Sequence, residues 1–530
     1  MTSTQRIRDV AREAFGHDDL LPGQAEAIGA LTGGHDVLLV SPTGAGKSLV
    51  YQVAGVLMGG CTIVVSPLLA LQQDQIERIV AAPGGLRAAR LSSAESDAKR
   101  RDVRARAAAG ELDFLLLSPE QLVDDEVRAD LARLRPKLVA VDEAHCVSVW
   151  GHDFRPDYFR LGDLLSELGE PRIAAMTATA APPVRDDIVD RLRMDAPRTV
   201  VTGFARPNLG LEVVRVVSED DQRDAVVAAV ADGGGPGIVY CRTRPTVEAY
   251  AELLGDRGRR VAAYHAGLGH RRRRETHEAF SDGEVDVIVA TSAFGMGIDK
   301  PDIRFVVHAQ APESPDIYYQ EVGRAGRDGA SATCSLVFRP EDLALGRFFS
   351  AAVPKEADVR RVLAALKEVE HDDRSAVAER AGLGPRKVGR ILNLLDLAGH
   401  GHRPASGDEH TAAVVEIAEA HRRLERSRVD MMRAYAETDR CRAEFLVGYF
   451  GEQVDRCGVC DNCRAGVAPE PGEDDATYPA QAHVEHDEFG RGVVTDVEED
   501  RLTVLFDAVG YRTLSLAVVD EEDLLRRVEQ

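Results

Sequence analysis

Residues 41–48 have the composition and spacing of a loop that binds nucleotide phosphates. The segment reads SPTGAGKS and lies between a β-rich run and the helix-like stretch KSLVYQVAGVL. In such loops glycines let backbone N–H groups face the phosphates, Lys47 meets the β- and γ-phosphates, and the Ser48 hydroxyl binds Mg²⁺. The strict pattern has glycine where Ser41 stands, so this loop is a variant. The residues expected to bind ATP here are Thr43, Gly44, Gly46, Lys47 and Ser48.

Two adjacent carboxylates, Asp142 and Glu143, stand at the end of the β-rich run LVAVD. An acid at the end of a strand can hold Mg²⁺, and its neighbour can polarise an attacking water. We therefore expect Asp142 to bind Mg²⁺ and Glu143 to act in hydrolysis. An Asp-Glu pair alone is usually a solvated turn, but together with the phosphate loop it predicts a nucleotide site.

Four cysteines near the end of the chain have the spacing of a metal site. Cys441, Cys457, Cys460 and Cys463 form a Cys-x15-Cys-x2-Cys-x2-Cys pattern. Four thiolates suit a closed tetrahedral Zn²⁺ site with no open position for water, so we predict a structural zinc. A redox-active pair is the alternative. The remaining cysteines stand alone and are expected to be reduced core residues: Cys61, Cys146, Cys241 and Cys334.

The elements that position these residues follow from the alternation of β-rich runs and helix-like stretches between Asp36 and Phe338. The runs are DVLLVS, TIVVS, FLLLS, LVAVD, IAAMT, GIVYC, VAAYH, VIVAT, FVVHA and TCSLVF. Ten strands exceed one doubly wound sheet, and the segment GFARPN carries glycine and proline. We therefore predict two tandem α/β domains with parallel sheets, residues 1–205 and 206–342. The cleft between them is the expected site.

Residues 343–405 are predicted to form a helix-turn-helix or winged-helix-like segment. The stretch SAVAERAGLGPRKVGRILNLLDLAG reads as a helix, a glycine-containing turn and a basic second helix. Arg386, Lys387 and Arg390 of the second helix are available to contact DNA phosphates. Plain helical packing gives the same pattern, so duplex contact and packing both remain open.

The last part of the chain combines a metal module, a linker and a small β-barrel. Residues 406–466 contain another helix-like stretch and the four clustered cysteines, and residues 467–479 are an acidic linker rich in proline and glycine. Residues 480–530 alternate apolar and polar positions around turn signals, which suggests a small β-barrel.

Length and composition favour a soluble protein of several domains. The chain has 530 residues, of which 44% are hydrophobic and 29% charged. No apolar stretch reaches the length of a membrane span, and MTSTQRIRDV lacks the pattern of a secretory signal, so we expect a cytoplasmic protein without membrane contact. The 88 acidic and 65 basic residues give a net charge of −23, which argues against indiscriminate coating of nucleic acid but permits a local basic groove.

A series of short motifs extends from Pro22 to Gly329. They are PGQ, PTGAGKS, VVSPLLALQQDQ, DEAHCVSVWGHDFRPDY, TATA, YHAGL, ATSAFGMGIDKPDIRFVVH and YYQEVGRAGRDG. With CRAEFLVGYFGE at the first clustered cysteine, this set resembles the RecQ DNA helicases of helicase superfamily 2, and the similarity runs from Phe15 to Cys463. The resemblance implies two RecA-like domains and an ATP- and Mg²⁺-dependent helicase that moves 3′ to 5′ on single-stranded DNA.

The resemblance assigns further residues to the nucleotide site. The amide of Gln24 is expected to pair with the adenine edge. A Tyr and an Arg commonly precede this glutamine in the family, whereas His17 and Leu21 stand here, so we expect weaker ATP affinity or looser base selectivity. In the second domain, Arg324 and Arg327 are expected to reach the γ-phosphate across the cleft.

By resemblance, Arg327 is the better candidate for the arginine finger, and Gln320 is expected to sense the same phosphate. A surface salt-bridge pair is the alternative for the two arginines. Because the two halves of the site lie on different domains, ATP binding is expected to close the cleft and hydrolysis to open it.

The stretch VSVWGHDFRPDY is the predicted contact with single-stranded DNA. Trp150 and Phe154 can stack on unpaired bases, and Arg155 can add a phosphate or cation–π contact. A buried aromatic cluster is the alternative, although polar residues interleave the aromatic ones. In RecQ-like helicases this loop couples DNA binding to ATP turnover.

The C-terminal segment HDEFGRG resembles the tudor-like tail of UvrD-type helicases. The resemblance implies that residues 480–530 form a barrel of the tudor or SH3 type. Because that tail binds protein partners, docking of a protein partner is our hypothesis for this segment.

For the whole chain we expect unwinding of duplex, forked or four-way junction DNA in recombination and repair. An RNA helicase, a duplex translocase, and a zinc-containing regulator whose ATPase is only a switch are the rival interpretations. His145 and the Thr-Ala-Thr motif argue against an RNA helicase of the DEAD-box group.

Overall fold

The computed structural model describes residues 3–67, 69–148, 158, 161–295, 300–344, 353–369, 374–399, 407–468, 477–498 and 500–528. The chain divides into two compact units. The first unit is Met1–Pro340 with Tyr435–Glu473, and the second is Glu341–Ala434 with Asp474–Gln530. The predicted nucleotide site and the clustered cysteines both belong to the first unit.

The first α/β domain is built on a seven-stranded parallel sheet with the order β3-β4-β2-β5-β6-β1-β7. Its central strands are continuous apolar runs because both faces are covered by helices. The strands are β1 (Val37–Val40), β2 (Thr62–Val65), β3 (Ala88–Leu91), β4 (Phe114–Leu117), β5 (Leu138–Val141), β6 (Arg172–Thr177) and β7 (Arg198–Val201).

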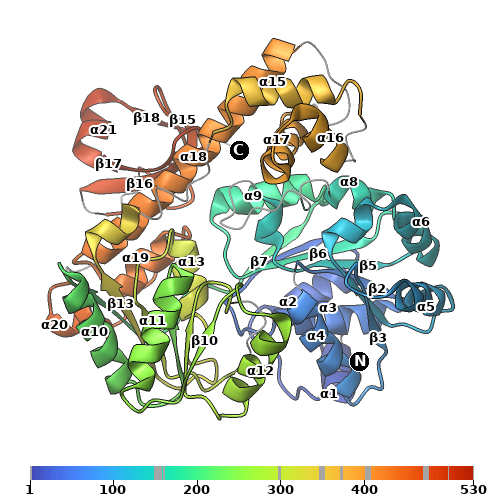
Figure 1. The fold of residues 1–530 in the computed structure, drawn as a ribbon, viewed down its shortest axis with the longest axis horizontal. Helices are drawn as coiled ribbons and strands as arrows, with labels where there is room; N and C mark the ends of the chain where they lie inside the picture. The colour runs from blue at the N-terminus through green and yellow to red at the C-terminus, as the bar shows by residue number, and fades with distance from the viewer. Residues whose placement is uncertain are drawn as a thin grey trace. The chain divides into compact units, whose positions relative to one another are not determined.

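Helices cover the two faces of this sheet, with α2 and α3 on one side and α8 and α9 on the other (Figure 1). One core cluster joins α1, α2 and α3 to alternate residues of the strands, such as Val37, Leu39 and Met176. The helices are α1 (Ser3–Phe15), α2 (Gln24–Thr32), α3 (Lys47–Met58), α4 (Leu69–Ala81), α5 (Asp97–Ala108), α6 (Asp125–Leu134), α8 (Leu161–Ser166) and α9 (Pro182–Arg191).

The second α/β domain has a six-stranded parallel sheet with the order β10-β11-β9-β12-β13-β8. Its strands are β8 (Leu209–Arg215), β9 (Gly237–Tyr240), β10 (Val261–Tyr264), β11 (Val287–Ala290), β12 (Phe305–His308) and β13 (Ala332–Phe338). Its helices are α10 (Glu219–Asp232), α11 (Arg244–Gly255), α12 (His270–Ser281) and α13 (Pro315–Val322). The two tandem parallel-sheet domains predicted from the sequence are therefore present.

All ten strands expected from the sequence are found, and three further strands were missed. These are β3, β7 and β8, each at the edge of its sheet. Edge strands need not be apolar on both faces, and these three carry Arg90, Arg198 and Arg215. Residues 202–208 connect β7 to β8 and so join the two sheets.

The cysteine module completes the first unit. It consists of the end of α18 (Gly407–Glu437), α19 (Arg442–Gly448), a loop, and α20 (Asp461–Ala465). Gly466, in a left-handed conformation with φ of 69°, ends α20.

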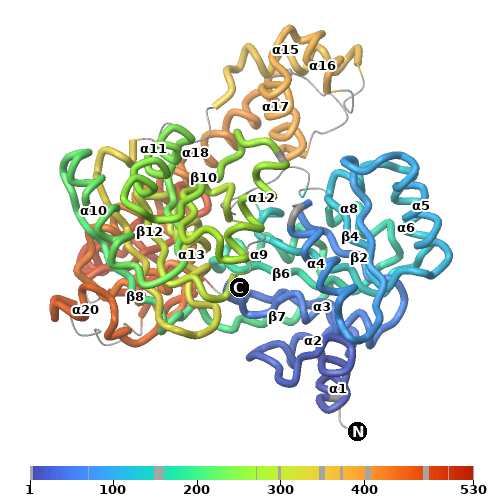
Figure 2. The backbone as a smooth tube through the Cα atoms, turned by 60° about the horizontal axis from the view of Figure 1, so that its bottom comes forward, coloured from blue at the N-terminus to red at the C-terminus, as the bar shows by residue number. Residues whose placement is uncertain are grey.

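The second unit contains a helical group and a small antiparallel sheet. Helices α15 (Glu356–Ala365), α16 (Arg374–Ala381) and α17 (Pro385–Leu397) form a compact group (Figure 2) around one apolar cluster that also includes Val414 of α18. The turn between α16 and α17 contains Gly382 at φ of 61°. Among the helices that the structure describes, none is long and apolar enough to cross a membrane.

The small β domain is a five-stranded antiparallel sheet with the order β17-β16-β15-β14-β18. Its elements are β14 (His483–His486), β15 (Gly490–Val497), β16 (Arg501–Phe506), β17 (Gly510–Ser515), α21 (Leu516–Glu522) and β18 (Leu525–Arg527). The sheet packs on α18, where the Tyr511 backbone N–H donates to Ser427 Oγ at 3.0 Å. A Cβ at Gly510 would collide with Ser427, which explains the glycine.

Candidate functional site

The predicted phosphate loop joins the end of β1 to the first residue of α3. Gly44 and Gly46 have φ of 86° and 66°, a left-handed backbone that favours glycine. The loop brings Thr43, Gly44, Gly46, Lys47 and Ser48 together at the N-terminus of α3, where backbone N–H groups and the helix dipole favour an anion. The local geometry therefore fits a bound phosphate group.

Lys47 lies inside this loop. Its Nζ donates to the carbonyl oxygens of Ser41 at 2.9 Å and Pro42 at 3.1 Å. Burial lowers the pKa of Lys47, an effect that the nearby carboxylates of Glu143 and Asp142 oppose. A polyanion bound in the loop would stabilise the charged ammonium further.

Asp142 and Glu143 follow β5 in a tight turn in which Glu143 has φ of 50°. Asp142 Oδ2 accepts a hydrogen bond from Gln75 Nε2 at 3.1 Å, and Oδ1 accepts one from the Glu143 N–H at 3.0 Å. Burial raises the pKa of Asp142, while Lys47 opposes that rise. Gln75 orients the carboxylate. It is the last residue of the motif VVSPLLALQQDQ, and no role was predicted for it from the sequence.

His145 connects the acidic turn to the end of β6. Its Nδ1 lies 3.0 Å from Thr177 Oγ1 and 3.4 Å from Glu143 Oε2. Thr177 Oγ1 also accepts a hydrogen bond from the Thr179 N–H at 3.2 Å. The DEAH and TATA motifs are therefore in direct contact, so a displacement of Glu143 can reach the Thr-Ala-Thr turn.

Gln24 is buried against the phosphate loop. Its Nε2 donates to the carbonyl oxygen of Gly46 at 2.9 Å, and its Oε1 accepts the Leu21 N–H at 2.9 Å. In this structure the amide therefore supports the loop, and adenine recognition by Gln24 stays a prediction. His17 and Leu21, which replace the Tyr and Arg of the family pattern, are both exposed.

The second domain contributes a loop with two arginines, residues 323–327, which we call the arginine loop. It follows α13, whose start is fixed by Pro315 and by Ser314 Oγ accepting the Ile317 N–H at 3.2 Å. Arg327 packs on the phosphate loop: a Cβ added at Gly44 would lie 3.1 Å from Arg327 Cγ. The structure thus brings Arg327 and the phosphate loop together from two different domains.

The other two predicted residues of this motif have different surroundings. Arg324 is buried beside Tyr240 of β9. Gln320 lies near the end of α13 and is half-buried. Of the predicted DNA contacts, Trp150, Phe154 and Arg155 lie outside the described residues, and Tyr158 of the same stretch is buried.

The four predicted metal ligands form one cluster. The sulfur atoms of Cys441, Cys457, Cys460 and Cys463 all lie within 4.8 Å of one another. Backbone N–H groups point at three of these sulfurs, with Cys457 N 3.3 Å from Cys441 Sγ and Cys460 N 3.3 Å from Cys457 Sγ. Such donors stabilise thiolates, so the cluster fits a four-coordinate structural Zn²⁺.

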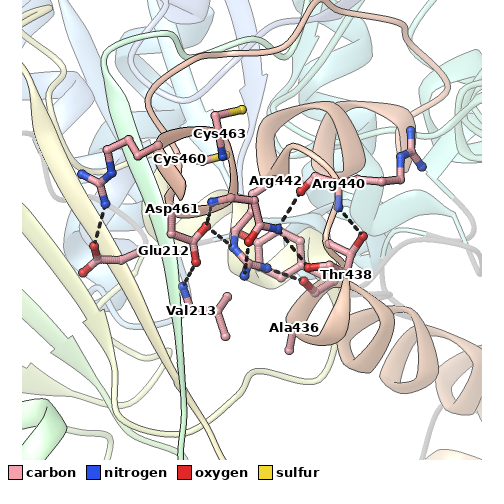
Figure 3. Close-up of polar contacts among 12 residues, drawn as sticks. Glu212, Val213, Ala436, Thr438, Arg440, Arg442, Cys460, Asp461 and Cys463 are labelled. Atoms are coloured by element: carbon pink, nitrogen blue, oxygen red, sulfur yellow. Dashed lines mark hydrogen bonds and ion pairs between the residues drawn. The ribbon is translucent and has the colours of Figure 1, made fainter. Parts of the chain in front are cut away.

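An ion pair with a buried arginine attaches this cysteine module to the edge of the second sheet (Figure 3). Asp461 Oδ1 accepts a hydrogen bond from Arg442 Nε at 2.6 Å, and Oδ2 accepts the Val213 N–H of β8 at 2.9 Å. Arg442 is 2% exposed and also donates to the carbonyl oxygen of Tyr435 at 2.8 Å. Arg442 directly follows Cys441, and Asp461 directly follows Cys460. The ion pair therefore connects the metal site to the edge strand β8.

The cysteine module also contacts both α/β domains. Tyr449 Oη donates to Asp316 Oδ2 of α13 at 2.5 Å. Phe450 stacks on Phe204 of the connecting segment with ring centroids 4.4 Å apart, and its carbonyl oxygen accepts Arg185 Nη2 of α9 at 3.3 Å. Loss of the metal should therefore disturb α13, which carries the arginine loop.

We expect removal of the metal to lower the melting temperature of the first unit by roughly 10 °C, because structural zinc contributes directly to folding free energy. Scanning calorimetry before and after treatment with a strong chelator measures this, with zinc content determined in parallel. Added zinc should restore the parent protein but not a Cys463→Ser variant. An unchanged melting temperature in metal-free protein would contradict a structural role.

Three protein-family models match the chain. The model described as DEAD/DEAH box helicase matches residues 21–188, the helicase conserved C-terminal domain matches residues 221–329, and RecQ zinc-binding matches residues 407–464. The first two matches lie within the two parallel-sheet domains, and the third ends just beyond Cys463.

Several curated proteins are similar over most of the chain. The ATP-dependent DNA helicase RecQ of Bacillus subtilis is 34% identical over 86% of this chain and 67% of its own length. That of Synechocystis is 34% identical over 88% of this chain and 100% of its own length. The match to RecQ of Pasteurella multocida is 40% identical over 64% of this chain but spans only 53% of that protein.

Solved structures share the fold at low sequence identity. Mycobacterium smegmatis helicase Lhr, bound to single-stranded DNA and AMP-PNP, superposes with a TM-score of 0.52 at 22% identity, covering 74% of this chain and 57% of that one. The DUF1998 helicase MrfA bound to DNA gives a TM-score of 0.54 at 21% identity, covering 65% of this chain and 50% of that one. At these identities the likeness concerns the fold alone.

Proposed function

The chain belongs to the RecQ family of ATP-dependent DNA helicases, and we propose that it couples ATP hydrolysis to 3′-to-5′ movement on single-stranded DNA. The single observation that carries the proposal is the packing of Arg327, from the second domain, on Gly44 of the phosphate loop in the first. A site divided between two domains converts nucleotide binding and release into relative motion of those domains.

The proposed roles at the nucleotide site follow from the chemistry of each side chain. Lys47 contacts the β- and γ-phosphates, and Glu143 polarises the attacking water. Ser48 and Asp142 hold Mg²⁺, which neutralises charge on the phosphate oxygens when bound. The buried, hydrogen-bonded Asp142 supports this assignment, because a fixed carboxylate with a raised pKa gains from a nearby cation.

In the second domain, Arg327 is the proposed arginine finger, with Arg324 and Gln320 sensing the γ-phosphate. Gln24 is proposed to read the adenine edge once its bonds to the loop rearrange. The position of Arg327 supports the finger role, since it is close enough to the phosphate loop for its charge to act on Lys47.

For DNA we propose stacking of unpaired bases on Trp150 and Phe154, with Arg155 at a phosphate. Duplex contact is proposed at α17, where Arg386 is exposed. The other two basic residues of that helix are less available for it. Lys387 Nζ forms an ion pair with Asp358 Oδ2 at 2.6 Å, and Arg390 is half-buried near Glu425.

Duplex, forked and four-way junction DNA are the proposed substrates, in recombination and repair. Membership of a family named for DNA helicase activity supports this proposal. For the small β sheet of residues 480–530 we propose docking of a protein partner, which rests on its resemblance to tudor-like tails.

Replacing Trp150 with alanine is expected to reduce DNA-stimulated ATP hydrolysis by roughly tenfold or more, because one base-stacking contact contributes about 1 to 3 kcal/mol. The assay measures ATP turnover with Mg²⁺ and either single-stranded DNA, single-stranded RNA or no nucleic acid. A Trp150→Phe variant, which keeps an aromatic face, is the matched control and should retain most of the stimulation.

Selective stimulation by DNA that Trp150→Ala reduces by roughly tenfold or more would support the coupled motor. Stimulation mainly by RNA would favour an RNA helicase. Turnover that ignores nucleic acid would favour a regulator in which the ATPase is only a switch.

A further inference from the structure

The segment that connects the two sheets, residues 202–208, contacts the phosphate loop through its first residue. Thr202 Oγ1 donates a hydrogen bond to Ser41 Oγ at 2.8 Å, and the Thr202 N–H donates to the carbonyl oxygen of Val40 at 3.1 Å. Ser41 occupies the position where the strict loop pattern has glycine, and glycine has no hydroxyl for this contact. The variant residue therefore ties the connecting segment to the nucleotide site.

Near its C-terminal end, the same segment binds the arginine loop through Arg206. Arg206 Nη2 donates to the carbonyl oxygens of Ala325 at 2.7 Å and Gly326 at 3.2 Å. Its Nη1 donates to the carbonyl oxygen of Gly323 at 3.3 Å. One guanidinium thus binds three of the four carbonyl groups of residues 323–326. Two of them belong to the residues on either side of Arg324, and the third belongs to the residue before Arg327.

Asn208 completes this arrangement. Its Nδ2 donates to the carbonyl oxygens of Gly326 at 2.9 Å and Ala330 at 3.0 Å. Its Oδ1 accepts Arg206 Nε at 3.4 Å. Gly326 has φ of 57°, and a side chain there would collide with Asn208. The turn that aims Arg327 is therefore shaped around two side chains of the connecting segment.

We propose that Arg206 is a positioning residue that fixes the arginine loop so that Arg327 faces the γ-phosphate. This inference rests on the proposed role of Arg327 as the arginine finger. The planar fork of an arginine satisfies several carbonyls at once, which a lysine ammonium does not reproduce. A catalytic group displaced by about 1 Å can lose on the order of 10²-fold in rate.

A purely structural role for Arg206 makes a different set of predictions. In that case its loss would lower the melting temperature of the protein, while each folded molecule would hydrolyse ATP at the parent rate. A positioning role instead lowers kcat in the folded protein, leaves the KM for ATP nearly unchanged, and acts only through Arg327.

The test compares Arg206→Ala and Arg206→Lys with the parent, in the full-length protein with Mg²⁺, ATP and saturating single-stranded DNA. We expect Arg206→Ala to lower kcat by roughly 100-fold and Arg206→Lys by roughly tenfold, with the KM for ATP changed by less than about threefold. Arg198→Ala is the matched control, because Arg198 is an exposed arginine at the start of β7 and should leave turnover unchanged.

The decisive comparison is the double variant Arg206→Ala/Arg327→Ala. If Arg206 acts through Arg327, the double variant should be no slower than Arg327→Ala alone. Losses that multiply, or a parent kcat in Arg206→Ala, would overturn the proposal. If Arg206→Ala does not fold, Arg206→Lys alone and in combination decides by the same criteria. A parent rate in Arg327→Ala would instead overturn the finger role, which separates the two failures.

Discussion

Replacing Arg327 with alanine should lower the DNA-stimulated rate of ATP hydrolysis by about 10³-fold or more, the range attributed to an arginine finger in phosphoryl transfer. Arg327 reaches the phosphate loop from the second domain, and its aliphatic chain packs on Gly44. Its positive charge helps to lower the pKa of Lys47. This position agrees with the proposed finger role, in which Arg327 stabilises negative charge that develops on the γ-phosphate during hydrolysis.

Steady-state turnover and ATP affinity measured on the same variants separate the possible outcomes. Arg327→Ala should bind ATP with an affinity close to the parent, because the phosphate loop is intact. Arg327→Lys keeps the charge but not the forked geometry, and it should recover only part of the rate. A near-parent rate in Arg327→Ala would show that the contact with Gly44 serves domain packing instead.

The parallel-sheet architecture could be predicted because buried central strands are continuous apolar runs. Runs such as VLLV and FLLL are buried throughout in the structure. The edge strand β8 was not predicted, because its sequence LGLEVVR mixes charged and apolar residues. An edge strand forms by pairing with one neighbour, here β13, and its free edge meets other groups, here the Asp461 carboxylate that accepts the Val213 N–H. No local sequence pattern reveals either contact.

The candidate site could be predicted at the level of motifs but not of contacts. Spacing alone identified the cysteine cluster, because two Cys-x-x-Cys units with an upstream ligand suit a metal. The role of Gln24 in supporting the phosphate loop was not predicted, because its partners there are backbone groups of Gly46 and Leu21. Arg206 was missed as well, because its partners are backbone carbonyls more than a hundred residues away, and backbone acceptors leave no signature in a sequence.

The contact between the connecting segment and the cysteine module was not predicted from the sequence. Phe204 stacks on Phe450, and its backbone N–H donates to Glu452 Oε2 at 3.2 Å, so the segment and the module pack against each other. Arg206 of the same segment holds the arginine loop. Mechanical support of the nucleotide site thus comes from residues outside its motifs.

Replacing Lys47 with alanine should abolish measurable ATP hydrolysis, a loss of at least about 10³-fold, and weaken ATP binding as well. In the structure its ammonium lies within the loop and donates to the carbonyl oxygens of Ser41 and Pro42. Because burial lowers its pKa, the charged form of Lys47 depends on nearby negative groups, and phosphates bound in the loop would add to them. ATP turnover and equilibrium binding of a fluorescent ATP analogue measure the two effects.

Glu143→Gln is the matched comparison, because it removes one negative charge at the same site while keeping the shape of the side chain. If Glu143 polarises the attacking water, this variant should bind ATP like the parent and hydrolyse it at least about 10²-fold more slowly. Lys47→Ala should lose both binding and turnover. Equal ATP affinity in Lys47→Ala and the parent would contradict a phosphate contact, and Lys47 would then serve only to hold the loop through the carbonyl oxygens of Ser41 and Pro42.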